Sequence, residues 1–402
     1  MRKLVFLEIA QNVWSKVVSW TPIVYLTRKE LIERGHEVHY TIPDDGNDYE
    51  EHEGIRIHRF WMPFYYNNPE KFGKGVSFIV AKAQYFFFQI FGTLKMAILA
   101  KKVKPDVIYS HGPYGIPIGS FIGKLRGIPN VSRTYGFVYA SIYSPVQQLA
   151  YFELPLSLRL PSALYLIGDD GTKVKTLSKR WRVPQDKAHY LVGGHNKNSY
   201  DPSFDVESFK KKIGIPSGSR VILSVCSLTK LKRTECVVKS LPKVLESHKD
   251  VYHVIVGDGP EEENLKRLAN SLGVRERVKF MGRVPFSDVQ KFYNIADIVA
   301  AIWSMYPVFE GMLSKKCVMT LNLGETDRFV KNMETGVLIE YPDLDELDRV
   351  FIKLLDSDEL RERIAENARR WALENLDTIE GRISKEVDLI EKTVEDWEKG
   401  ER

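Results

Sequence analysis

The sequence predicts an α/β protein with two doubly wound, Rossmann-like domains that face each other across a cleft. The main evidence is that apolar runs of strand length alternate with helical stretches in both halves of the chain. Residues 197–205 are polar and contain Pro202, as an inter-domain linker often does. We therefore predict an N-terminal domain over residues 1–197, a C-terminal domain over 198–375, and a final helix over 376–402 with the option of packing back on the first domain.

Length, charge and cysteine content restrict the class of protein. The chain has 402 residues, enough for two or three domains, and a formal net charge of only +5, which argues against a nucleic-acid-binding protein. Its three cysteines are too few for a disulfide framework and lack metal-ligand spacing. The first residues read better as a strand than as a signal peptide. A cytoplasmic protein is expected, with peripheral contact at the cytoplasmic face of a membrane as an option.

The first half begins as strand, helix, strand, because the helical pattern of residues 20–34 stops at Gly35, a natural helix cap. Further apolar runs, each bounded by turn residues, predict the other strands. We expect strands at residues 3–9, 37–42, 54–60, 107–112, 130–134, 164–167 and 188–192, and helices at 20–34, 76–100 and 119–126.

The second half repeats a strand, a turn suited to phosphate, and a helix. Strands are expected at residues 221–226, 251–256 and 278–284, and charged helices at 358–374 and 378–397. The basic turn 227–233 follows the first of these strands, and Gly257-Asp258-Gly259-Pro260 follows the second. Parallel sheets bind nucleotides at the carboxyl ends of their strands, so this half is predicted to hold a nucleotide-linked donor.

Residues 76–100 form the most apolar stretch, and there is no acidic residue between Lys71 and Pro105. One interpretation is a helix that lies on an anionic membrane with its lysines toward the head groups. The other is a core helix that covers the N-terminal sheet. Core packing is favoured because the polar residues form two narrow stripes, as expected for a helix packed on more than one face.

Four residues, at three places in the sequence, could carry chemistry. Lys230 and Lys232 add charge where a strand ends and a helix begins, which would stabilise a departing diphosphate. Glu310, read as lying at a helix start, suits ribose hydroxyls, although an acid there also favours the helix dipole. His111, at a strand end beside Gly112, could act as a base or hydrogen-bond donor, although a single histidine is more often structural. The competing interpretation of the lysines is a solvated turn.

The second half contains a series of motifs: Ser224-Val225-Cys226-Ser227-Leu228-Thr229-Lys230-Leu231-Lys232-Arg233, Val254-Ile255-Val256-Gly257-Asp258-Gly259-Pro260, and residues 278–284, 293–298, 309–318 and 334–339. In these motifs it resembles the retaining glycosyltransferases of family 4, which have the GT-B fold. Weaker matches in the first half are residues 34–38, 104–111 and 127–129.

The resemblance implies transfer of a hexosyl group from a nucleotide-sugar to a hydroxyl of a glycan or lipid-linked acceptor, with retention at the anomeric carbon and with no metal or cofactor. It implies that Lys232 binds the diphosphate and Glu310 the ribose. The implied donor-binding set is Ser227, Lys230, Lys232, Gly282, Arg283 and Glu310; the acceptor-binding set is His111, Tyr135 and Ser19; and the catalytic set is Lys232, Glu310 and His111.

The chain departs from the family in four respects. Ser227 stands where the family often has arginine, Ile302 where it has a first glutamate, and Tyr135 where it has histidine, while Val18 and Ser19 replace its paired glycines. Two alternatives therefore stay open: a catalytically impaired nucleotide-sugar-binding partner protein, and a GT-B epimerase or phosphorylase.

Overall fold

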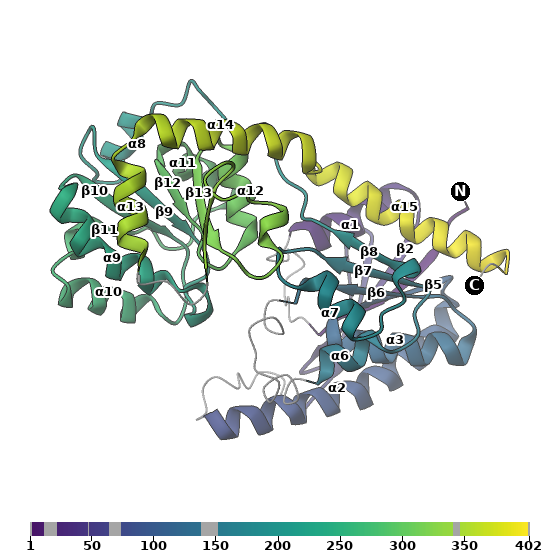
Figure 1. Cartoon of the computed structure of the whole chain (residues 1–402). Helices are drawn as coiled ribbons and strands as arrows, with labels where there is room; N and C mark the ends of the chain where they lie inside the picture. Colours follow the sequence, from purple (N-terminus) through teal and green to yellow (C-terminus); the bar gives the residue numbers. More distant parts are fainter. Residues whose placement is uncertain are drawn as a thin grey trace. The chain divides into compact units, whose positions relative to one another are not determined.

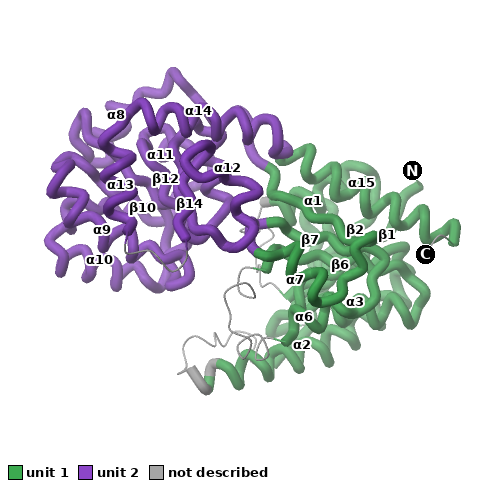
Figure 2. Tube along the Cα trace, in the orientation of Figure 1, with its two compact units in different colours: residues 1–169, 173–194, 379–402 green, residues 170–172, 195–378 purple. Residues whose placement is uncertain are grey.

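The computed structural model of the chain describes residues 2–11, 22–46, 48–63, 74–137, 152–340 and 346–400 (Figure 1). It forms two compact units (Figure 2). Unit 1 comprises residues 1–169, 173–194 and 379–402, and unit 2 comprises residues 170–172 and 195–378. Each unit has its own mainly parallel sheet with helices on its faces, which confirms the predicted α/β fold class.

The unit boundaries differ by a few residues from the predicted domain boundaries. The chain passes from unit 1 to unit 2 after Gly194, slightly before the predicted linker, and returns after Thr378. Residues 170–172 belong to unit 2 because the Gly171 carbonyl accepts hydrogen bonds from Glu325 N and Thr326 Oγ1. The final helix belongs to unit 1.

Unit 1 contains an eight-stranded sheet in the order β3-β4-β2-β1-β5-β6-β7-β8, parallel except at its β3 edge. Its elements are β1 (Val5–Ile9), α1 (Pro22–Glu33), β2 (Glu37–Asp44), β3 (Tyr49–His52), β4 (Ile55–Trp61), α2 (Lys74–Val103), β5 (Val107–His111), α3 (Gly112–Arg126), β6 (Asn130–Thr134), α6 (Glu153–Leu158), β7 (Leu164–Gly168), α7 (Val174–Arg180), β8 (Ala188–Leu191) and α15 (Ile379–Glu398).

The alternation of side chains along β1 builds a core on each face of this sheet. Phe6 packs with the cluster that includes helices α1 and α15, whereas Leu7 and Ile9 pack with the cluster that includes α2 and α3. Successive strand residues point to opposite faces, so two helical layers enclose the sheet.

Helix α3 begins at Gly112, seven residues earlier than predicted. Pro113 falls in the first turn, where a missing N–H costs nothing because no intrahelical partner exists for it. The helix also lies very close to the sheet: a Cβ at Gly119 would be 1.7 Å from Ser110 Oγ. Only glycine permits this approach.

Helix α2 extends over 30 residues. One side of it packs on the sheet through Phe88, Met96 and Leu99, as the core interpretation predicts. The opposite side does not fit that interpretation, because Ile90 and Leu94 are more than half exposed there.

Unit 2 contains a six-stranded parallel sheet in the order β11-β10-β9-β12-β13-β14. Its elements are α8 (Val206–Lys212), β9 (Arg220–Val225), the 3₁₀ turn η3 (Lys230–Lys232), α9 (Thr234–Ser247), β10 (Val251–Val256), α10 (Glu262–Ser271), β11 (Val278–Phe280), α11 (Phe286–Ile295), β12 (Ile298–Ala300), α12 (Met305–Leu313), β13 (Cys317–Leu321), β14 (Val337–Ile339), α13 (Leu347–Leu355) and α14 (Asp358–Asn375).

Candidate active site

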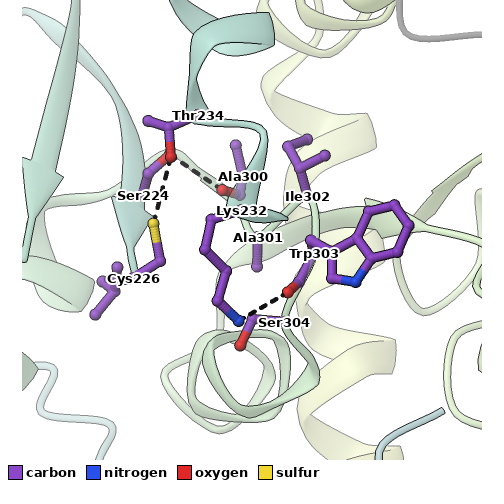
Figure 3. Close-up of a pocket in the computed structure, with 10 residues that line it drawn as sticks. Ser224, Cys226, Lys232, Thr234, Ala300, Ala301, Ile302, Trp303 and Ser304 are labelled. Carbon is purple, nitrogen blue, oxygen red and sulfur yellow. Dashed lines mark hydrogen bonds between the residues drawn. The ribbon is translucent and has the colours of Figure 1, made fainter. Parts of the chain in front are cut away.

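The strand order of unit 2 reverses between β9 and β12, and a pocket lies at this point. Strand β9 leads through α9 to β10 on one side, and β12 leads through α12 to β13 on the other. Such a reversal opens a crevice at the carboxyl ends of the two strands, where open α/β sheets bind ligands. The pocket is lined by Ser224, Val225, Cys226, Lys232, Thr234, Ala300, Ala301, Ile302, Trp303 and Ser304 (Figure 3).

Lys232 is the charged residue of this lining. It ends η3, and its side chain reaches across the pocket to donate a hydrogen bond of 3.0 Å from Nζ to the Trp303 carbonyl oxygen (Figure 3). Burial lowers the pKa of the Lys232 ammonium, with Cys226 and Asp170 acting in the opposite direction. An ammonium has three N–H donors, so an anion in the pocket could receive bonds from the same group.

Ser227 and Lys230, from the same predicted donor set, are both exposed and are absent from the pocket lining. The pocket lining therefore includes one of the two lysines of the predicted turn, and the structure distinguishes the two by their exposure.

The glycine-rich turn after β10 packs directly against the basic turn. A Cβ at Gly257 would be 1.9 Å from the Cys226 carbonyl oxygen, and one at Gly259 would be 2.4 Å from the Leu228 carbonyl oxygen. Leu228 N also donates a 2.7 Å hydrogen bond to Asp258 O. The two turns thus form one rigid edge, which fixes the start of η3.

Gly282 and Arg283 follow β11, which ends at Phe280 rather than at residue 284 as predicted. Gly282 turns the chain with a φ of 64° and accepts a 2.8 Å hydrogen bond from Gly257 N. Arg283 is exposed. Both residues lie at the same edge of the sheet as Lys232, beyond the end of β10.

Glu310 does not lie at a helix start, and the prediction of its position is wrong. Helix α12 begins at Met305, because Pro307 falls within its first turn, where no amide hydrogen is needed. Glu310 is therefore in the body of the helix, buried, with Oε1 2.9 Å from His195 Nδ1. Its negative charge adds to burial in raising the pKa of Tyr306.

His195 is a residue whose role the sequence did not reveal. It follows the predicted strand 188–192 in a Gly-Gly-His-Asn turn and is fully buried. Its Nε2 atom has no hydrogen-bond partner among the described residues. The turn motif was the only sign of His195 in the sequence. Its contact with Glu310 could not be read from a motif, because the two residues are 115 positions apart.

Ile302 stands where the resemblance places a glutamate. It is 2% exposed and lines the pocket beside Lys232. None of the lining residues is acidic. The pocket therefore has one positive group and no carboxylate among these residues to oppose it.

The strand order of unit 1 reverses between β1 and β5, and a second polar cluster lies there. His111, the last residue of β5, has Nε2 3.2 Å from Glu8 Oε2 and Nδ1 2.7 Å from the Tyr135 hydroxyl. Glu8 is fully buried and receives a 2.7 Å hydrogen bond from Arg28 Nε. Burial would raise the pKa of Glu8, but Arg28 and His111 outweigh burial and lower it.

These partners determine the hydrogen-bond directions in the cluster. An ionised carboxylate only accepts, so His111 donates from Nε2 to Glu8 and accepts at Nδ1 from the Tyr135 hydroxyl. Burial lowers the pKa of His111, which favours this neutral form. Tyr135 is 47% exposed, so it presents the cluster to solvent. In the sequence, one sign of this cluster is Glu8, an acidic residue within an otherwise apolar strand.

Ser19, the remaining predicted acceptor residue, lies outside the described residues. Within the described ranges, no group of three or more His, Cys, Asp or Glu side chains could hold a metal ion.

The chain is similar in sequence to known proteins. Residues 205–371 match the family of glycosyl transferases group 1. An uncharacterized glycosyltransferase of Methanocaldococcus jannaschii is 24% identical over 85% of this chain and 86% of its own length. The alpha-monoglucosyldiacylglycerol synthase of Streptococcus pneumoniae is 26% identical over 67% of this chain and 59% of its own length.

Solved structures show the same fold. The Anabaena protein HepE in complex with UDP and glucose superposes with a TM-score of 0.73 over 97% of this chain and 100% of its own, at 16% identity. Residues 205–371 thus match the group 1 glycosyl transferases, the family 4 of the resemblance, and the chain has the GT-B fold. It is accordingly a glycosyltransferase that uses a nucleotide-sugar donor.

Proposed function

We propose that this enzyme transfers a hexosyl group with retention of anomeric configuration to a hydroxyl of a glycan or lipid-linked acceptor. The observation that carries the proposal is the half-buried Lys232 ammonium, which lines the β9–β12 pocket and is held there by the Trp303 carbonyl. A positive group held in a fixed position stabilises charge that develops on a departing diphosphate, with little cost in reorganisation.

In this proposal each part of the donor is bound by a different residue: Lys232, Gly282-Arg283 or Glu310. Lys232 binds the diphosphate, and the backbone around Gly282 and Arg283 lies near the base. Glu310 receives the ribose hydroxyls once its bond with His195 is shared or exchanged. The free acceptor capacity of a carboxylate, about four lone-pair sites, permits both partners.

The reaction is a front-face displacement. The bond between the anomeric carbon and the diphosphate oxygen breaks as the acceptor oxygen bonds to the same face of the sugar. The acceptor proton passes to the leaving phosphate oxygen. This route needs no enzymic nucleophile, and the pocket lining offers no carboxylate for one.

On the acceptor side, His111 acts through Tyr135. Because the Tyr135 hydroxyl donates to His111 Nδ1, its oxygen is left to accept a hydrogen bond from an incoming hydroxyl. Tyr135 therefore replaces the family's histidine as an acceptor rather than a donor of hydrogen bonds.

The test is a panel of nucleotides and nucleotide-sugars. Compounds that bind the folded enzyme raise its melting temperature, and a true donor should then release nucleoside diphosphate when acceptors are added. The anomeric coupling constant of the product, measured by NMR, distinguishes retention from inversion. A folded protein that neither shifts nor releases diphosphate with any member would contradict the proposal.

A second candidate is a nucleotide-sugar-binding protein without turnover. It is favoured by Ile302, which puts an apolar side chain where a sugar-binding acid is expected. Stabilisation by a nucleotide-sugar without diphosphate release would support this candidate over the enzyme.

A cytoplasmic location, with the enzyme peripheral at the membrane, completes the proposal. The Streptococcus relative is by its name a synthase of a glucosylated diacylglycerol, and a lipid product of that kind is consistent with this placement.

A further inference from the structure

The outward side of α2 carries a continuous apolar stripe. Five large side chains follow one another at intervals of four or seven residues, and each is 55% to 67% exposed: Ile79, Phe86, Ile90, Leu94 and Ile98. Residues with this spacing lie on one side of a helix. Isolated exposed apolar residues are ordinary, but a stripe along a helix marks an interaction surface.

The stripe belongs to a helix that also packs on the sheet of unit 1. Residues 78–103 are long and apolar enough to cross a membrane, but 39% of their most apolar window is buried inside the protein. Phe88 and Met96 are fully buried against the sheet of unit 1. One side of helix α2 is therefore buried in the core, and the other side is exposed and can contact a partner.

Helix α3 extends the surface. Both helices pack on the same face of the sheet through one shared core cluster, so their outward sides belong to one surface of unit 1 (Figure 1). On α3, Phe121 and Leu125 are 57% and 63% exposed. We call the outward sides of α2 and α3 the apolar face.

Basic residues border the apolar face. The exposed residues Lys101, Lys102 and Lys104 follow Ile98, and the exposed Lys124 and Arg126 flank Leu125. No ion pair involves these five side chains within the described ranges. The sequence from Lys71 to Pro105 has no acid to neutralise them.

The positive charge of this border favours one of two partners for the apolar face. A second copy of the chain, docked through the same face, would bring one basic border near another. An anionic bilayer instead offers an apolar interior for the stripe and negative head groups for the border. Lysine and arginine stems can also lie along the apolar surface while their charges reach the head groups.

We propose that the apolar face of unit 1 docks on an anionic lipid bilayer and holds the enzyme at the membrane surface. This inference goes beyond the proposed sugar transfer and does not depend on the pocket of unit 2. It gives the proposed membrane placement a defined surface, formed by α2 and α3.

The experiment is vesicle flotation of the full chain. Wild-type protein should float with vesicles of phosphatidylcholine and phosphatidylglycerol, and to a much smaller extent with phosphatidylcholine alone. Ile90→Ser combined with Leu94→Ser should weaken binding by at least about tenfold, because two apolar side chains no longer enter the lipid. Lys101→Glu combined with Lys102→Glu should remove the preference for anionic vesicles.

Phe286→Ser is the matched control, since Phe286 is 56% exposed but lies in unit 2. It should float as the wild type does. Absence of flotation by wild-type protein, or equal loss in the control, would overturn the proposal. So would a dimer, detected by sedimentation, that the Ile90 and Leu94 changes dissociate.

Diphosphate release with a water-soluble acceptor separates this proposal from the proposed function. The α2 variants should retain that activity at the wild-type rate. Loss of flotation with activity intact supports docking, whereas inactive protein that still floats would count only against sugar transfer.

Discussion

The only charged side chain that lines the unit 2 pocket, among the described residues, is that of Lys232. Its neighbour in the same turn, Lys230, has the same charge but is exposed to water. A charge that is partly shielded from water acts more strongly on a reacting group than the same charge in solvent. Substituting each of the two lysines in turn therefore distinguishes a catalytic role from that of a surface charge.

Lys232→Ala should lower the rate of transfer about a hundredfold, because it removes a charge contact made in the transition state. Lys230→Ala should change it no more than about twofold, as expected for an exposed charge. Steady-state rates at saturating donor and melting temperatures of both variants are the measurements. Equal losses in the two variants would refute the distinction.

At the carboxyl edge of the unit 1 sheet, Tyr135→Phe tests the acceptor side. It removes a single hydroxyl and leaves the ring in place. The KM for the acceptor should rise about fivefold, the effect of one lost hydrogen bond, while the KM for the donor stays the same. A change confined to the donor KM would show that Tyr135 contacts the donor instead.

At the scale of elements, β10 carries a titratable group inside the unit 2 sheet. His253 is fully buried, with Nε2 3.0 Å from Ser224 Oγ. Burial lowers its pKa from 6.5 to about 3. Below pH 6.5 the unfolded chain therefore binds a proton at His253 that the folded unit does not bind. The free energy of unfolding consequently decreases as the pH falls.

The free energy of unfolding of unit 2 should be about 2 kcal/mol lower at pH 5 than at pH 7.5 on account of His253, since about 1.5 pKa units separate pH 5 from 6.5. Denaturant titrations at the two pH values measure it. His253→Asn should flatten this dependence. Because His58 in unit 1 has a pKa lowered to about 4 by burial, the wild type and variant must be compared at the same pH. An unchanged slope in the variant would contradict the assignment.

Most elements were predictable because their patterns are local. The parallel strands read as apolar runs, and Gly35 and the turn after β9 marked where elements end. Strand β3 was missed because Tyr49-Glu50-Glu51-His52 is polar on both sides and pairs only at the sheet edge. The start of α3 was missed because Gly112 and Pro113 look like a turn until the helix is seen to begin with them.

The candidate site was predictable only in part, for a different reason. The turn with Lys232 is contiguous in sequence, so a motif reveals it. The partners that hold the site are remote: Trp303 lies 71 positions from Lys232, and Glu8 lies 103 positions from His111. Nor could the sequence tell which side of α2 packs on the sheet, since apolar residues occupy both sides.

At the scale of the whole chain, α15 returns to complete unit 1. Glu386 on this helix is buried with Arg133 and Arg382 and accepts a hydrogen bond from Tyr109. Burial alone would raise the pKa of Glu386, but the two arginines lower it to about 2. The carboxylate thus ties the last helix to strands β5 and β6.

Glu386→Gln should lower the free energy of unfolding of unit 1 by about 3 kcal/mol, because it leaves two buried guanidinium groups without their counter-charge. Glu395→Gln, an exposed position on the same helix, should have an effect of less than about 0.5 kcal/mol. Denaturant unfolding monitored separately for the two units is the measurement. A similar effect of the two substitutions would argue against the buried network.

The position of α15 after unit 2 in the sequence also determines when unit 1 can be completed during synthesis. A ribosome releases the chain from the N-terminus, so the strands of unit 1 emerge first and those of unit 2 later. Val387, Ile390 and Val394 of α15 belong to the unit 1 core, so the part of that sheet face beside α1 stays uncovered until α15 has been translated. The unit that begins first is completed last, and a nascent chain must keep that apolar face from aggregating while all of unit 2 is being made.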